Sequence, residues 1–245
     1  MKTRTRGAKA VFLGTALLAL AGLAQANPVI SFVPGTLFDT AAISSSDVSG
    51  EQMAGMTVTA CNIDNACRTS TWAAGTLGSQ TGGAVDGLNF SLTQTADSFS
   101  GLWMFESVVA YSRFTIIGRP GGIVFDTVLG SNQSPGSANG RPFTINQIGD
   151  FANLSLAVTY TDQLYVGGRV YDDLYTVMTV DWGRDVAGVM TFLADTDSAV
   201  GGSTRINPLV PAPPNPNPNP VPLPGTLALV GAALLGLGLT RRRRG

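Results

Sequence analysis

The chain has 245 residues, of which 44% are hydrophobic and 13% are charged, and it contains no histidine and two cysteines. Without histidine, the chain acting alone can form neither a Ser-His-Asp or Cys-His catalytic unit nor the usual zinc ligand sets. The length suits one sizeable domain with additional sorting segments. We therefore expect a protein that is not an enzyme.

The formal net charge of -1 conceals a segregation of charge along the sequence. Residues 27–207 contain seven arginines, no lysine and all 16 acidic residues, so this segment carries 7 − 16 = −9. The remaining basic residues lie in the first ten positions and near the C-terminus. We expect no nucleic-acid partner, because an acidic surface repels phosphates.

Residues 1–26 have the features of a secretory signal peptide. A basic stretch runs from Lys2 to Lys9, 14 uncharged residues follow at 11–24, and Ala24 and Ala26 supply small side chains at the two positions that signal peptidase needs. We expect cleavage after Ala26. A retained membrane anchor is the alternative, but the uncharged stretch is short of the roughly 20 residues that a spanning helix needs.

Export favours a disulfide between Cys61 and Cys67, because compartments outside the cytoplasm are oxidising. Short Thr-rich runs at 57–61 and 67–72 flank a polar segment that is typical of a hairpin loop. Facing residues in a non-hydrogen-bonded antiparallel pair have Cα atoms about 4.5 Å apart, a separation that a disulfide tolerates. We expect a Cys61–Cys67 disulfide, with two free thiols or half of a metal site as the alternatives.

Residues 27–207 predict one all-β domain. Several runs alternate apolar and polar residues with period two, which places the apolar members on one face of a strand: 88–93, 154–160 and 175–180. Further short apolar runs are separated by Gly, Ser, Asn and Asp clusters: 102–105, 114–117, 123–128 and 189–193. Many short strands at this spacing are typical of an antiparallel β-sandwich, which we expect to be jelly-roll-like.

Two residue types in this domain bear on ligand binding. Trp72, Trp103 and Trp182 are expected in the core or at the rim of the sandwich, with a sugar-stacking surface as the alternative. Asp195 and Asp197 would lie on one face of an extended strand, or around a turn, and offer carboxylates to calcium. Because Asp-rich turns are common without metal, we expect no cofactor and keep calcium as the alternative.

The composition changes at 208–224, where nine of 17 residues are proline. Such a segment favours polyproline II and predicts a semi-rigid linker. Residues 225–240 follow without a charge, and the tail 241–245 contains four consecutive arginines. We expect a transmembrane helix at 225–240 with its arginine tail in the cytoplasm, according to the positive-inside rule. An ordinary tail anchor is one alternative.

The segment 221–245 resembles the PEP-CTERM sorting signal of bacterial surface proteins. Three parts match in order: a short motif, a Gly- and Leu-rich helix and a terminal arginine cluster, with the matching residues Val221, Pro222, Leu223, Pro224, Gly225, Thr226, Arg241, Arg242, Arg243 and Arg244. Leu223 stands where the family usually has glutamate, as in its Val-Pro-Leu-Pro variant. The resemblance implies processing by an exosortase in the inner membrane of a Gram-negative bacterium. A sortase signal is the second alternative, but Leu227 stands where sortase requires glycine.

The domain is also similar to ectodomains that precede PEP-CTERM signals, through short segments at 53–58, 122–126, 135–140, 173–175 and 195–197 and through Trp72. The resemblance implies an exported cell-surface or extracellular-matrix protein with a structural or adhesive role in a biofilm or exopolysaccharide layer. Its partners would be the exosortase, the inner membrane in transit, and extracellular polysaccharide. The alternative is a carbohydrate-binding or carbohydrate-active module, with or without stabilising calcium.

Overall fold

The computed structural model describes residues 27–46, 48–77, 80–85, 89–128, 134–136, 139–200 and 206–208. Within these ranges the chain forms β-strands and three short 3-10 helices, η1 (Gly50–Met53), η2 (Arg119–Gly121) and η3 (Gly149–Phe151). The all-β expectation is confirmed. In this part of the chain no helix has the length and apolar character needed to cross a membrane. The expected signal peptide, the linker beyond Pro208 and the expected sorting segment lie outside the described residues.

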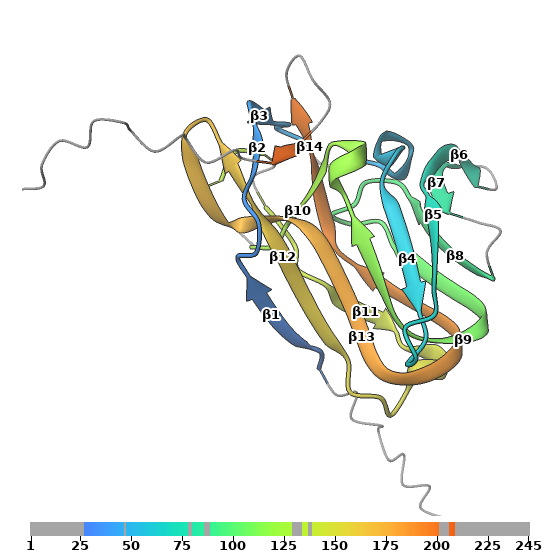
Figure 1. Cartoon of the computed structure of the whole chain (residues 1–245). Helices are drawn as coiled ribbons and strands as arrows, with labels where there is room; N and C mark the ends of the chain where they lie inside the picture. The colour runs from blue at the N-terminus through green and yellow to red at the C-terminus, as the bar shows by residue number, and fades with distance from the viewer. Residues whose placement is uncertain are drawn as a thin grey trace, which may run out of the picture. The chain divides into compact units, whose positions relative to one another are not determined.

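Two long strands, β9 (Trp103–Ile117) and β13 (Arg169–Leu193), organise the sheet (Figure 1). They pair with each other antiparallel from Val177 and Ile117 to Phe192 and Trp103. Phe105 and Phe114 lie on the same strand, β9, where nine residues would span about 30 Å if the strand were straight. Their ring centroids are nevertheless 4.8 Å apart. The strand therefore folds over, and the sheet forms two layers around a common core.

The front layer contains the C-terminal part of β9 and the N-terminal part of β13 (Figure 1). β4 (Thr57–Cys61) pairs with β9, and β5 (Cys67–Thr71) pairs with β4. On the other side, β12 (Ala157–Val166) pairs with β13, and β1 (Val29–Val33) pairs with β12. The strand order in this layer is therefore β5-β4-β9-β13-β12-β1.

The back layer contains the other halves of the two long strands. β8 (Phe90–Thr95) pairs with β9, β7 (Gln80–Val85) pairs with β8, and β6 (Ala73–Leu77) pairs with β7. β11 (Thr144–Gln147) pairs with the C-terminal part of β13. All these pairs are antiparallel, and hydrogen bonds along β9 and β13 connect the two layers into one continuous sheet.

The remaining strands are short. β10 (Ile123–Asp126) pairs with β13 and β14 (Asp195–Val200), and β14 pairs with β3 (Ala42–Ile43). β2 (Phe38–Thr40) pairs with β12 and with β15 (Asn207–Pro208). Both β1 and β2 run parallel to β12, so the expectation of a purely antiparallel sandwich is wrong at this edge. The reason is that the segment 29–40 runs along β12 in a single direction. β1 pairs with the first half of β12, and after a short break β2 pairs with its end.

Period-two alternation directs one face of the front layer into the core, as the sequence predicts. Val58, Phe114, Val158 and Val180 are fully buried, whereas their immediate neighbours along each strand face outward. The predicted strands at 102–105 and 114–117 are two parts of β9, and those at 175–180 and 189–193 are two parts of β13.

β13 can pass from one layer to the other because its ladder with β9 is interrupted. The register with β9 shifts between Asp181 and Gly188. Gly183 and Gly188 adopt φ angles of 73° and 154° there, which side chains disfavour. An irregularity of this kind bends a strand and increases its local twist.

Tyr160 connects the core to the segment that precedes β11. Its ring is fully buried, and its hydroxyl accepts a hydrogen bond from the backbone N–H of Phe143 at 2.7 Å. Burial raises the pKa of Tyr160 strongly above the ordinary value of 10.0; the bond from Phe143 lowers it in part, and the charge of Asp195 raises it further. The folded state therefore holds this phenol in its neutral form.

A Tyr160→Phe variant tests this assignment. Because a raised pKa favours the protonated folded state, the contribution of Tyr160 is fully present below about pH 10 and is lost as the pH rises further. At pH 7 the variant should lose about 1–3 kcal/mol of unfolding free energy, since the Phe143 N–H loses its acceptor. Thermal melts from pH 7 to 11 should show a smaller alkaline loss in the variant than in the wild type. Parallel pH curves for the two proteins would contradict the assignment.

Candidate functional site

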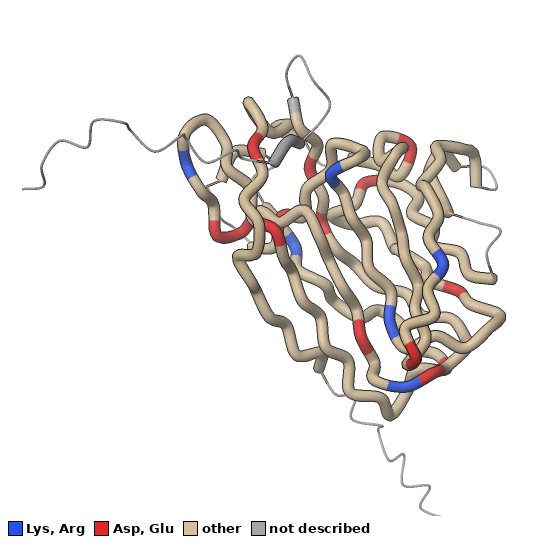
Figure 2. Tube along the Cα trace, viewed as in Figure 1, with Lys and Arg blue, Asp and Glu red and all other residues tan. Residues whose placement is uncertain are grey.

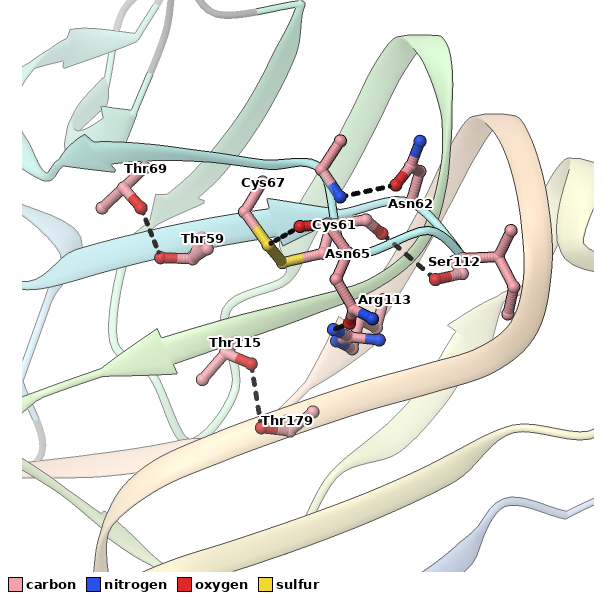
Figure 3. The surroundings of a disulfide bond; sticks show 12 residues. Thr59, Cys61, Asn62, Asn65, Cys67, Thr69, Ser112, Arg113, Thr115 and Thr179 are labelled. Atoms are coloured by element: carbon pink, nitrogen blue, oxygen red, sulfur yellow. Dashed lines mark hydrogen bonds between the residues drawn. A yellow bond between two sulfur atoms is a disulfide. The ribbon is translucent and has the colours of Figure 1, made fainter.

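The expected disulfide is present and closes the β4–β5 hairpin (Figure 3). Cys61 and Cys67 face each other as the last register pair of the two strands, with Cα atoms 4.1 Å apart. In the loop between them, Asn65 has a φ of 62°, and the Asn62 side chain accepts a hydrogen bond from the Ala66 N–H at 2.8 Å. The disulfide therefore fixes the end of the hairpin beside β9.

A row of hydroxyl side chains crosses the outer face of the front layer, perpendicular to its strands. The register aligns one such residue from each of the six strands, in the order Thr69, Thr59, Thr115, Thr179, Thr159 and Ser31. We call these residues the hydroxyl row. Neighbouring strands are about 4.7–4.9 Å apart, so the row repeats a hydroxyl at that interval.

Hydrogen bonds join neighbouring members of the hydroxyl row (Figure 3). The hydroxyl oxygens of Thr59 and Thr69 are 2.8 Å apart, and those of Thr115 and Thr179 are 3.0 Å apart. The four central members are half-buried, whereas Thr69 and Ser31 at the two ends are exposed. Each hydroxyl offers one donor and two acceptor positions, so a bond to one neighbour leaves capacity for a ligand.

The rows on either side carry little charge. One contains Thr71, Thr57, Ile117, Val177, Thr161 and Val33, and the other contains Cys67, Cys61, Arg113, Asp181, Ala157 and Val29. The two charged members already have polar partners, because Arg113 donates to the Asn65 side chain and Asp181 accepts from the Gly183 N–H at 2.7 Å. β1, at the end of these rows, contains no charged residue (Figure 2).

This arrangement is suited to a ligand that is extended, uncharged and rich in hydroxyl groups. Such a ligand could lie along the row and exchange hydrogen bonds with each strand in turn. A polyanion fits poorly, because residues 27–207 carry a formal charge of −9. The row therefore favours a neutral polysaccharide chain over a nucleic acid or an acidic polymer.

The three tryptophans belong to the core, and the sugar-stacking alternative is wrong for them. Trp72, Trp103 and Trp182 are exposed by 1%, 0% and 3%. Each indole N–H donates to a backbone carbonyl, with N···O distances of 2.7, 2.9 and 2.7 Å. Their faces pack against other aromatic rings, so none can stack on a sugar at the surface.

Asp195 and Asp197 lie on the extended strand β14, and both are fully buried. Asp195 accepts hydrogen bonds from the Ser98 hydroxyl at 2.9 Å and from the Thr196 N–H at 2.8 Å, and it faces Asp126 on β10. Among the described residues, no three His, Cys, Asp or Glu side chains form a group that could hold a metal ion. The calcium alternative stays a prediction.

The other residues singled out from the sequence lie outside the described ranges: Ala24 and Ala26 at the expected cleavage site, and the motif and arginines within 221–245. Sequence reasoning did not identify the hydroxyl row. The outward positions of the period-two runs are rich in threonine, which is a visible pattern, but the alignment of one strand with the next cannot be deduced from it.

Comparisons with known proteins assign the chain to no family. No protein-family model matches the chain, and the searches of curated proteins and of solved structures return no significant match.

Replacing both cysteines tests the role of the disulfide. Closing so short a loop constrains the unfolded chain by an amount worth about 2 kcal/mol, so Cys61→Ala/Cys67→Ala should lower the unfolding free energy by that amount. Urea denaturation followed by tryptophan fluorescence measures the change. A reducing agent should destabilise the wild type similarly and leave the variant unaffected; an equal response of both proteins to reduction would contradict the assignment.

Proposed function

We propose that this protein is exported, sorted by an exosortase and retained at the cell surface or in an extracellular matrix. There it acts as a structural or adhesive component of a polysaccharide layer. The hydroxyl row carries the adhesive part of the proposal, because it presents evenly spaced hydrogen-bonding groups on a face with few charges. The disulfide supports export, since such bonds persist in oxidising compartments.

The sorting part rests on the sequence of 221–245 and its resemblance to PEP-CTERM signals. The proline-rich linker would hold the domain away from the membrane until the signal is processed. The two-layered arrangement supports the proposed jelly-roll-like sandwich as a compact unit that can be displayed in this way. We propose no catalytic activity for it.

Deleting residues 225–245 tests the sorting proposal. The intact chain should yield an envelope or matrix form that has lost its arginine tail, whereas the truncated chain should change its location because the exosortase has no substrate helix. Cell fractionation measures the location, and mass spectrometry of the C-terminal peptide shows whether the tail has been removed. Unchanged fractionation of the truncated chain, or an intact tail on extracellular protein, would contradict the proposal.

A Thr115→Val/Thr179→Val variant tests the adhesive proposal. Valine keeps the shape of threonine but removes the two central hydroxyls, so binding to a neutral polysaccharide should weaken at least tenfold, which corresponds to about 1.4 kcal/mol. A sedimentation assay with insoluble cellulose and with the producing bacterium's purified exopolysaccharide measures this loss. Thr76→Val, at an exposed threonine of β6, is the matched control and should bind like the wild type.

The same assay separates the proposal from its alternative, a carbohydrate-active module. Release of reducing sugar from either polymer would favour that module, whereas binding without product favours adhesion. Equal binding by the wild type and the double variant would show that the hydroxyl row is not the contact surface. A fall in melting temperature on adding a calcium chelator would add bound calcium to either role.

A further inference from the structure

We propose that two copies of this chain pair edge to edge through β1, with Ser31 of one copy opposite Ser31 of the other. The pairing would be antiparallel and two-fold symmetric. It would extend the front layer of one molecule into that of the second. This inference concerns assembly and stands whether or not the hydroxyl row binds polysaccharide.

The first observation is an open strand edge. β1 pairs with β12 on one side, and no other strand within the described ranges pairs with it. The Val29 N–H donates to the Leu156 carbonyl at 2.9 Å. Because alternate residues of a parallel strand bond to the same neighbour, Val29, Ser31 and Val33 direct their backbone groups to β12. Ile30 and Phe32 therefore direct their N–H and C=O groups to the open side.

The second observation is that this edge lacks the usual protection against pairing. Natural edge strands are commonly blocked by a charged side chain, a proline or a bulge. Pro28 and Pro34 lie just outside β1, but the strand itself, Val-Ile-Ser-Phe-Val, contains no proline and no charge, and its register with β12 is continuous. Val29, Phe32 and Val33 are exposed by 67%, 47% and 45%. An uncharged edge is also the place where two domains of net charge −9 repel each other least.

The third observation is that the strand complements itself. When two antiparallel copies are centred on Ser31, Val29 lies opposite Val33 of the second copy, and Ile30 lies opposite Phe32. Ile30 and Phe32 are the residues with outward backbone groups, so each such pair exchanges both of its N–H···O bonds. All cross-strand partners other than the two serines are apolar, and the interface is isologous, as two-fold dimers require.

The strand is held in position before it meets a partner. The Phe32 ring lies 5.6 Å from the ring of Tyr160 and 5.5 Å from that of Tyr175. Just beyond β1, the Pro34 carbonyl accepts a hydrogen bond from the Gln163 N–H at 3.0 Å. The Asp162 carboxylate accepts from the Thr36 N–H at 3.0 Å and forms an ion pair with Arg119. A fixed edge loses less conformational entropy on pairing.

The register has a geometric consequence for the hydroxyl row. Ser31 is the last member of the row at this edge of the front layer. A two-fold axis through the facing serines, perpendicular to the sheet, keeps both outer faces on the same side. The two rows would then continue into each other, and their combined length would be twice that in a single copy.

Cysteine trapping in the exported full-length chain tests the pairing. In the proposed register, Ser31 and its counterpart form a non-hydrogen-bonded pair with Cα atoms about 4.5 Å apart, so Ser31→Cys should form a disulfide-linked dimer. Val29→Cys is the matched control, because its cysteine would face Val33 of the partner. Non-reducing electrophoresis should show at least tenfold more dimer for Ser31→Cys. Peptide mapping should show the new bond at position 31, with the Cys61–Cys67 disulfide intact.

Equal trapping of the two variants, no dimer for Ser31→Cys, or its linkage to a different protein would overturn the proposal. Charge variants in the Ser31→Cys background provide a second measurement. Val29→Lys/Val33→Lys places like charges opposite each other and should reduce trapping at least fivefold. Val29→Lys/Val33→Glu places opposite charges there and should restore it. Failure of the second pair to restore trapping would overturn the register.

Discussion

Phe105, Phe114 and Trp182 pack against one another although they come from different halves of two long strands. This contact requires β9 and β13 to cross from one layer into the other. Once they do so, every remaining strand of either layer adds to an existing edge. The inward aromatic side chains form the core, and one row of outward positions across the front layer is occupied by threonine and serine. Both the core and the hydroxyl row therefore depend on the fold-over of these two strands.

The part of the fold that could be predicted from the sequence is the part that depends on local periodicity. Alternation in 154–160 correctly places the buried face at the start of β12, whereas in 175–180 of β13 every residue except Thr179 is buried. The disulfide could be predicted because export, loop length and strand spacing all favour the same pairing of Cys61 with Cys67. These inferences need no knowledge of contacts between distant segments.

The remainder depends on long-range pairing. The apolar runs at 102–105 and 114–117 look like separate strands because polar residues between them, such as Glu106 and Arg113, interrupt the apolar pattern. Similarly, the parallel course of β1 along β12 joins residues more than 120 positions apart, and nothing in either segment specifies that neighbour. The hydroxyl row combines five registers, of which three join segments that are distant in sequence, and a one-residue slip in any of them would turn a hydroxyl side chain toward the core.

The three indole rings illustrate a different consequence of this packing. Their N–H groups bond to the carbonyls of Gly50 on η1, Ala194 before β14 and Tyr111 on β9. Each ring thus joins the aromatic interior to the backbone of a different segment. Because all three indoles are buried and hydrogen-bonded, their fluorescence reports on the folded state of the domain. Solvent reaching any one of the rings would reveal which piece of backbone detaches first when the molecule is stretched or heated.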